Sequence, residues 1–319
     1  MFNHSMIMIC VLFICASCTH NPPLENIFTI SQEELNKLQL EYYSDYFSFV
    51  GEDNQGKVSF AIDNNRGQDQ RSWQADHFLV MHDEHKGWQS LIGNGLYPNT
   101  NGLLKQIPDS EYFQFRGTPQ TGMKLLSQAN KLELQIEPLQ NRLSKNEGLS
   151  IYQMNSGTAV LSWNDRTIPG RVIHEFLYLP AFNRLSRKYL GVFKDFHGIY
   201  AKIGNYGDLY IHSQDNPVMA KLIGLNNGFI VMNNETLPLN NLIINPQDRS
   251  FRIGLHRWPD DWQGSFDYVG KQQPFSLQLK QRNDIANWFI GGFAMGIVNG
   301  TVQINDEKIE VYGLGEVIL

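Results

Sequence analysis

The feature that most constrains this chain is a strict alternation of apolar and polar residues in many short segments. Val58, Phe60 and Ile62 share one face of their segment, and small or polar residues lie between them. Successive side chains of a β-strand point to opposite faces, so a period of two with one polar face is typical of half-buried antiparallel strands. The same pattern recurs over 131–137, 209–211, 251–255, 275–279, 302–304 and 309–311.

Turn-forming residues separate these segments. Stretches rich in Gly, Asn and Asp occupy 52–56, 83–87, 204–207 and 305–308. Many short strands with regular turns predict a sandwich or a barrel. One short helix is expected near the N-terminus, because Ser31 and Glu34 form a capping box ahead of Leu35 and Leu38. We therefore predict an all-β chain with one short N-terminal helix.

A polar stretch over 138–150 interrupts the alternation. We interpret it as the approach to a second β unit, which divides the body into an N-terminal domain over 31–145 and a C-terminal domain over 146–319. The chain has 319 residues, enough for one large or two medium domains.

The first residues are typical of an export signal. The apolar run Met6–Ile14 is too short to span a bilayer, which takes roughly 20 residues. Ala16, Ser17 and Cys18 follow it and resemble a bacterial lipobox, although Cys15 stands where Leu is usual and no Lys or Arg precedes the run. We predict a signal peptide over 1–17, lipidation of Cys18 and a tether over 18–30. A plain secretory signal cut near the same place is the alternative.

Charge and cysteine content exclude several functions. The net charge is −6 with a pI of about 5.8, which argues against a nucleic-acid partner, because phosphates require a basic surface. All three cysteines lie in the leader, so we expect no disulfide or thiolate chemistry in the body. No phosphate-binding loop or nucleophile elbow occurs, and His82 and His85 lie in a predicted turn without zinc-site spacing. We predict neither a cofactor nor a metal.

Four segments, in order, resemble the tandem lipocalin-like proteins related to carotenoid hydratase, the hydroxyneurosporene synthase family. They are 46–60, 168–176, 195–211 and 300–317, the last of which ends in Gly-x-Gly followed by Glu316. The sequence departs from the family where paired tryptophans are usual in the first strand, since Tyr42-Tyr43 or Tyr46-Phe47 stands there. Glu316 also follows Gly315 more closely than the family pattern has it.

The resemblance implies two lipocalin-like antiparallel β-barrel units packed together, with an inward cavity for an apolar small molecule. It also implies hydration of an isolated carbon–carbon double bond in a terpenoid, or a related cyclisation. Such chemistry requires a carboxylic acid that burial keeps protonated. It also requires aromatic rings that stabilise a carbocation, and one positioned water.

The candidate catalytic residues are Glu175, His174, Asp195 and His197. The candidate ligand-binding residues are Tyr43, Tyr46, Phe176 and Tyr200. Strand alternation puts His174 on the face of Phe176 and puts Glu175 on the opposite face, so only one of the pair can line a given interior. An ion pair for Glu175, a structural His174 and a turn-capping Asp195 are the alternatives.

Three functions remain open at this point. The first is a lipoprotein that binds an apolar small molecule, a lipid or an isoprenoid, in its barrel. It would be anchored in the bacterial cell envelope and face the periplasm; Thr19 after the lipidated cysteine favours the outer membrane. The second is a hydratase or cyclase that protonates a terpenoid double bond, and the third is a structural envelope lipoprotein without a ligand.

Overall fold

A computed structural model describes residues 40–69, 72–99, 114–147, 150–180, 196–205, 207–214, 226–247, 251–253, 256–268, 270–288 and 291–318. Every helix or strand in these residues is a β-strand, so the prediction of an all-β chain is confirmed. The predicted leader and tether lie outside the described residues, as do the residues on which the predicted helix rests. Tyr42 and Tyr43 lie in the first strand. The described part contains no helix long and apolar enough to cross a bilayer.

The first sheet is antiparallel and has ten strands within the described residues. They are β1 (Leu40–Asp53), β2 (Gly56–Asp69), β3 (Ser72–Asp83), β4 (Gly87–Asn99), β5 (Gln114–Thr118), β6 (Gly122–Ser127), β7 (Leu132–Ile136), β8 (Gln140–Glu147), β9 (Ser150–Trp163) and β10 (Arg166–Pro180). Their order is β4-β3-β2-β1-β10-β9-β7-β6-β5, and β8 pairs with β9 beside this path.

The second sheet has nine antiparallel strands in the described part of the chain. They are β11 (Phe196–Ile203), β12 (Gly207–Gln214), β13 (Asn227–Met232), β14 (Glu235–Pro238), β15 (Asn240–Gln247), β18 (Asp261–Tyr268), β19 (Lys271–Trp288), β20 (Gly291–Ile304) and β21 (Glu307–Ile318). Their order is β14-β13-β12-β11-β21-β20-β19-β18-β15. The strands β16 (Phe251–Ile253) and β17 (His256–Trp258) form a separate hairpin.

The two sheets share one connectivity. In each, the first strand lies in the middle, between the second strand and the last one, so β1 pairs with β10 and β11 pairs with β21. This repeated arrangement agrees with the predicted pair of lipocalin-like units. The first sheet ends at Pro180 and the second begins at Phe196, so β9 and β10, which follow the domain boundary predicted at 145/146, belong to the first sheet. Whether each sheet is a separate domain stays a prediction.

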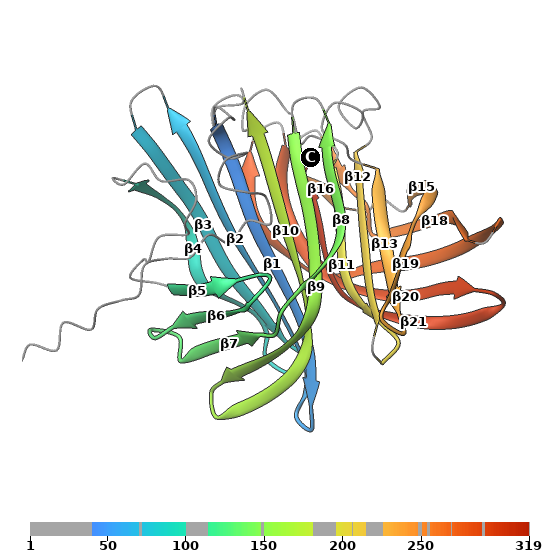
Figure 1. Cartoon of the computed structure of the whole chain (residues 1–319), viewed down its shortest axis with the longest axis horizontal. Helices are drawn as coiled ribbons and strands as arrows, with labels where there is room; N and C mark the ends of the chain where they lie inside the picture. The colour runs from blue at the N-terminus through green and yellow to red at the C-terminus, as the bar shows by residue number, and fades with distance from the viewer. Residues whose placement is uncertain are drawn as a thin grey trace, which may run out of the picture.

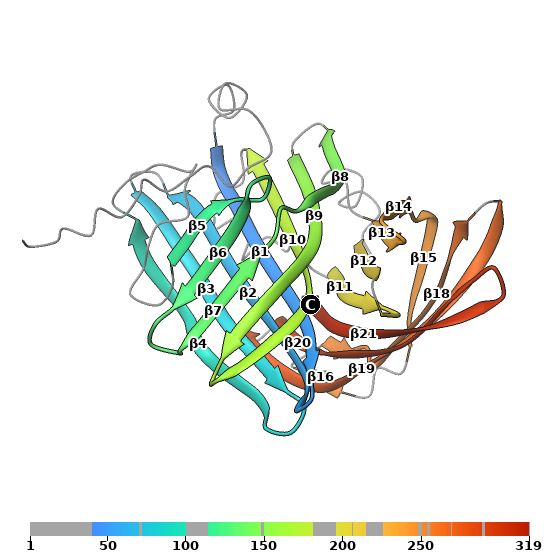
Figure 2. The same cartoon turned by 60° about the horizontal axis from the view of Figure 1, so that its bottom comes forward.

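Alternation along the strands produces three buried layers. Phe47, Val172 and Phe176 belong to the core of the first sheet, and Ile199 and Ala201 belong to the core of the second. A third cluster combines side chains of both sheets, among them Tyr46, Tyr152, Ile173, Tyr200, Tyr210 and Leu314. Figures 1 and 2 both show β1, β9 and β10 beside β11 and β12, where this third layer lies. The sheets are therefore packed face to face through residues that a single sheet would expose.

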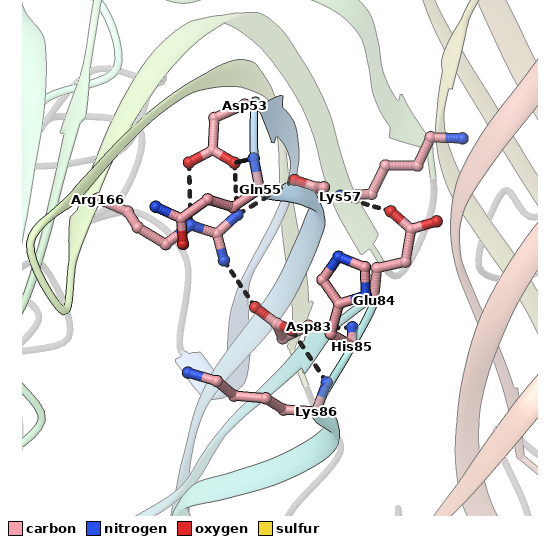
Figure 3. Close-up of polar contacts among 9 residues, drawn as sticks. Asp53, Gln55, Lys57, Asp83, Glu84, His85, Lys86 and Arg166 are labelled. Carbon is pink, nitrogen blue, oxygen red and sulfur yellow. Dashed lines mark hydrogen bonds and ion pairs between the residues drawn. The ribbon is translucent and has the colours of Figure 1, made fainter.

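A buried arginine connects three strand ends at one end of the first sheet. Arg166 begins β10, and its guanidinium binds Asp53 at the end of β1 through contacts of 2.6 and 2.9 Å. Its Nη1 donates to Asp83 at the end of β3 over 2.6 Å (Figure 3). The hydrogen bond from Arg166 lowers the pKa of Asp53. One side chain thus connects three strand ends that are far apart in the sequence.

Replacing Arg166 with methionine is expected to destabilise the fold by about 3 kcal/mol, because two carboxylates would lose their shared cation in a poorly hydrated place. Urea unfolding measures this loss. The matched control is Lys124→Met, which removes an ion pair with Glu133 whose side chains are 42% and 39% exposed. That variant should lose less than about 1 kcal/mol. Equal losses in the two variants would contradict the role given to Arg166.

Candidate functional site

The strand β10 presents its two faces to two different cores. His174, Val172 and Phe176 face the core of the first sheet, and Ile173, Glu175 and Leu177 face the layer between the sheets. This division follows from the strand period. Glu175 therefore points at the second sheet and not into a barrel interior, where the sequence analysis expected the site.

Each sheet contributes one tyrosine from its first strand and one glutamate from its last strand to the same place. Tyr46 of β1 lies opposite Glu175 of β10 in the first sheet. In the second sheet, Tyr200 comes from β11 and Glu316 from β21. The ring centroids of Tyr46 and Tyr200 are 4.5 Å apart. The four side chains thus form a compact cluster between the sheets.

Tyr200 connects the two carboxyl groups. Its hydroxyl lies 2.7 Å from Glu175 Oε2 and 2.9 Å from Glu316 Oε1. Tyr210 of β12 donates a further hydrogen bond of 3.0 Å to Glu175 Oε2. A phenol has only one hydrogen, so Tyr200 can donate to one carboxyl at a time. The other contact is a hydrogen bond only when that carboxyl is protonated and donates to the phenol oxygen.

Burial favours the protonated form of both glutamates. Glu175 and Glu316 are 7% and 6% exposed, and within the described residues neither forms an ion pair with a cation. Burial raises the pKa of Glu175 to about 8, with a further rise from the negative charge of Asp63. Burial, together with Glu175 and Asp63, raises the pKa of Glu316 well above its ordinary value. At neutral pH the cluster therefore holds acidic protons.

The hydroxyl of Tyr46 is buried and has no hydrogen-bond partner within the described residues. A buried hydroxyl without a partner costs free energy, so such groups in native proteins call for an explanation. Burial, then the charges of Glu316, Asp63 and Glu175, raise the pKa of Tyr46 well above its ordinary value, so this phenol stays protonated. It is a donor available to an oxygen of a bound molecule or a water.

The carboxyl of Glu316 fits beside Tyr200 because its neighbour on β11 is a glycine. Gly198 lies opposite Glu316 in the pairing of β11 with β21. A Cβ at position 198 would lie 2.8 Å from Glu316 Cγ and 2.9 Å from both Glu316 Oε1 and Tyr200 Cε2. These distances are shorter than van der Waals contact. Only glycine leaves room for the carboxyl at this place.

The substitution Gly198→Ala is expected to destabilise the protein by about 1–3 kcal/mol, since the new methyl group displaces Glu316 or Tyr200 from a packed layer. Thermal or urea unfolding measures the loss. The variant Glu316→Ala removes two of the three atoms that the methyl group would strike and leaves Tyr200 Cε2, so the same glycine substitution should cost less in that background. Additive losses in the double variant would show that the strain lies elsewhere.

The strand β12 places three polar side chains in a row toward the first sheet: Asp208, Tyr210 and His212. Asp208 is fully buried and accepts two hydrogen bonds from Arg171, of 2.7 and 2.6 Å, and one of 2.7 Å from Ser156. Tyr210 contacts Glu175, as described above. His212 Nδ1 lies 3.1 Å from the hydroxyl of Tyr152 on β9. The layer between the sheets is therefore polar along one line and apolar around it.

The other predicted residues lie elsewhere. His174 stacks on Phe47 at 4.4 Å, its Nδ1 lies 3.1 Å from Asn155 Nδ2, and it faces the core of the first sheet together with Phe176. His197 lies in the second sheet's interior, where its Nδ1 is 3.3 Å from Trp262 Nε1. Asp195 and the side chain of Tyr43 lie outside the described residues. Of the predicted residues, the structure brings together Glu175, Tyr46 and Tyr200.

Sequence reasoning missed Tyr210, His212 and Asp63, and used Glu316 only as part of a closing motif. The alternation over 209–211 predicts a strand from its apolar residues, but it does not indicate what the opposite face of that strand contacts. The signal that was present is the series Asp208, Tyr210 and His212, which is unusually aromatic for a solvated face. Within the described residues, no three His, Cys, Asp or Glu side chains are grouped so that they could hold a metal ion.

Comparison by sequence finds no matching protein family and no matching curated protein. Comparison by structure finds kievitone hydratase from Nectria haematococca, with a TM-score of 0.58 and 11% identity over 92% of this chain and 97% of that one. A candidate AttH protein from Nitrosomonas europaea gives 0.56 and 11% identity, over 87% and 92% of the two chains.

CghA, solved with Sch210972, gives a TM-score of 0.51 and 10% identity, over 88% of this chain and 89% of that one. At such low identity these matches concern the fold alone. They extend over most of each chain, so the likeness includes both sheets and not one unit only. The chain therefore shares the lipocalin-like, two-sheet fold of these proteins, as the resemblance predicted.

Proposed function

We propose that this protein is an acid catalyst of the hydratase or cyclase type, which binds an apolar small molecule between its two sheets and protonates a carbon–carbon double bond. The observation that carries the proposal is the pair Glu175 and Glu316, buried together and bridged by Tyr200. Alkenes are very weak bases, so their protonation needs a proton donor that is not hydrated and that stays protonated at the working pH.

The surrounding groups suit the rest of such a reaction. Protonation of a substituted double bond leaves a carbocation, which the negative faces of aromatic rings stabilise. The ring centroids of Tyr46 and Tyr200 are 4.5 Å apart, and those of Tyr200 and Tyr210 are 5.4 Å apart. The Tyr46 hydroxyl supplies a donor for a polar group of the substrate or for the attacking water. The apolar side chains around them favour a terpenoid or a similar apolar molecule.

The fold comparisons support the same reaction class. Kievitone hydratase is a hydratase by its name, and CghA was solved with a small molecule, Sch210972. A carrier that only binds an apolar ligand needs no shared protons between buried acids. Two buried glutamates without a cation would destabilise a carrier and would not strengthen its binding of an apolar ligand. We therefore place catalysis ahead of carriage.

The proposal is tested with isotopes, because the substrate is not identified. Purified protein is incubated with geraniol, farnesol or geranylgeraniol in doubly labelled water, D2-18O, and the products are analysed by mass spectrometry. An alcohol that carries one deuterium on carbon and one 18O, or a deuterated cyclic isomer, supports the proposal. The double variant E175Q/E316Q should lose this product, and the surface variant Glu133→Gln should keep it. Binding of these probes without isotope incorporation would favour carriage instead.

We also propose that the protein works in the bacterial cell envelope, facing the periplasm and anchored by a lipid on Cys18. The support is the apolar run Met6–Ile14 and the small residues before Cys18. Cys18→Ser should move the protein from the membrane fraction into the soluble fraction of its host, since stable anchoring depends on the acyl chains. The control is Cys10→Ala, which lies in the apolar run ahead of the lipobox and should remain in the membrane fraction. An unchanged distribution for Cys18→Ser would exclude the lipid anchor.

A further inference from the structure

The catalytic cluster has a second polar group beside it that the acid step does not use. His212 is 1% exposed, and its Nδ1 lies 3.1 Å from the hydroxyl of Tyr152. The two rings stack at 5.5 Å, and Phe196 meets the imidazole edge-on at 4.3 Å. The ring of Tyr210, whose hydroxyl binds Glu175, is 5.8 Å from the imidazole. The histidine thus adjoins the acid cluster and is held in one orientation.

The strands hold His212 and Tyr152 at a fixed distance from Glu175. On β12, His212 follows Tyr210 by two residues on the same face. On the facing sheet, Tyr152 of β9 lies opposite Leu177, two residues beyond Glu175 on β10. His212 therefore lies two residues along its strand from Tyr210, and Tyr152 lies at the same step along its sheet from Glu175. Two residues of a strand span roughly 7 Å. We expect a small molecule that contacts Glu175 to extend toward this pair.

Acid-catalysed hydration needs a group at such a place. When the double bond takes a proton from Glu175, the π electrons form a C–H bond and the neighbouring carbon becomes cationic. Water then forms a C–O bond to that carbon, and the oxygen must lose one proton. A cyclisation ends in the same way, with loss of a proton from carbon. The carboxylate left on Glu175 lies on the side of the double bond that received the proton. A separate proton acceptor therefore allows water to add to the cationic carbon from another direction.

We propose that His212, oriented by Tyr152, is the base that accepts this second proton. The inference rests on the proposed function, because it concerns the same site. The imidazole gains the proton that the water oxygen loses, and the imidazolium later returns one proton through solvent to the carboxylate of Glu175, so both groups regain their resting forms. Histidine suits the role, since its ordinary pKa lies near neutrality and a hydrogen bond to one ring nitrogen fixes which tautomer is present.

The double-isotope assay separates the two steps. Protonation by Glu175 alone is reversible and exchanges deuterium into recovered alkene, whereas the base step brings 18O into the product. In His212→Gln, we expect the 18O product to fall by at least about 100-fold, while deuterium still enters the recovered alkene. The matched control is His82→Gln, another buried histidine, which lies at the end of β3 and should keep the full yield of 18O product.

Tyr152→Phe provides a second variant should His212→Gln fold poorly, because it removes a single oxygen and keeps the stacked ring. It is expected to lower the 18O product by about 10-fold with deuterium exchange retained. Unchanged 18O product in both folded variants would overturn the inference, and so would equal loss of deuterium exchange and 18O product. Absence of both isotopes in the unsubstituted protein would instead refute the proposed function itself.

Discussion

Raising the pH from about 5 to about 8 is expected to destabilise this protein by roughly 1.4 kcal/mol per pH unit through Glu175 alone. The pKa of Glu175 is about 8 in the folded state, against 4.5 for the ordinary side chain. Between these values the folded state binds the proton that the unfolded state has lost. The stabilising contribution of Glu175 is therefore complete below the pKa of the unfolded state, and it decreases as the pH rises toward the pKa of the folded state. Glu316 acts in the same direction.

Urea unfolding over this pH range measures the slope. Glu175→Gln carries no titratable group, so its slope should be smaller by about 1.4 kcal/mol per pH unit, and near pH 8 the variant should be the more stable protein. Glu133→Gln, at the surface, should follow the unsubstituted chain. A Glu175→Gln variant with an unchanged slope would mean that Glu175 titrates normally and that the site lacks its proton donor.

Removing Arg171 is expected to cost about 3 kcal/mol, because Asp208 would remain fully buried without its bidentate partner. Arg142 limits the loss, since it lies close enough for the charge of Asp208 to act on it. Arg171 and Asp208 connect the strand of Glu175 with the strand of Tyr210. Their separation should therefore also admit water to the cluster and bring the pKa of Glu175 closer to its ordinary value.

Denaturant unfolding of Arg171→Met, Asp208→Leu and the double variant tests this account. The double variant should be more stable than Arg171→Met, because it no longer buries an uncompensated charge. Arg282→Met is the control, since its contact with Asp284 joins two residues of one strand. A double variant that loses the sum of the two single losses would show that Arg171 and Asp208 act independently.

The sequence predicts the strands well because their information is local. Val58, Phe60 and Ile62 repeat with the period of the pleat, and all three are buried in one core. The domain boundary predicted at 145/146 lies within the strands of the first sheet, which extends to Pro180. The polar stretch over 138–150, interpreted as the approach to a second unit, contains the strand β8, which pairs with β9. A polar strand and a polar linker have the same composition, and only pairing distinguishes them.

The candidate site was predicted in part for a related reason. The alternation correctly placed Glu175 and His174 on opposite faces of their strand. It could not indicate which part of the protein packs against each face. The face of β10 that carries Glu175 and the face of β12 that carries Tyr210 meet each other in the layer between the sheets. Contacts such as Glu175 with Tyr200 and Asp208 with Arg171 join residues of different sheets, and their geometry depends on how the sheets pack. No local pattern contains that information.

The central claim is that Glu175 and Glu316 hold acidic protons at neutral pH, and infrared difference spectroscopy tests it most directly. Spectra of the unsubstituted protein and of E175Q/E316Q are compared at pH values from about 6 to about 9. The account predicts a C=O stretch of a protonated carboxyl at neutral pH, absent from the double variant and decreasing as the pH passes about 8. A spectrum with only carboxylate bands at neutral pH would contradict it.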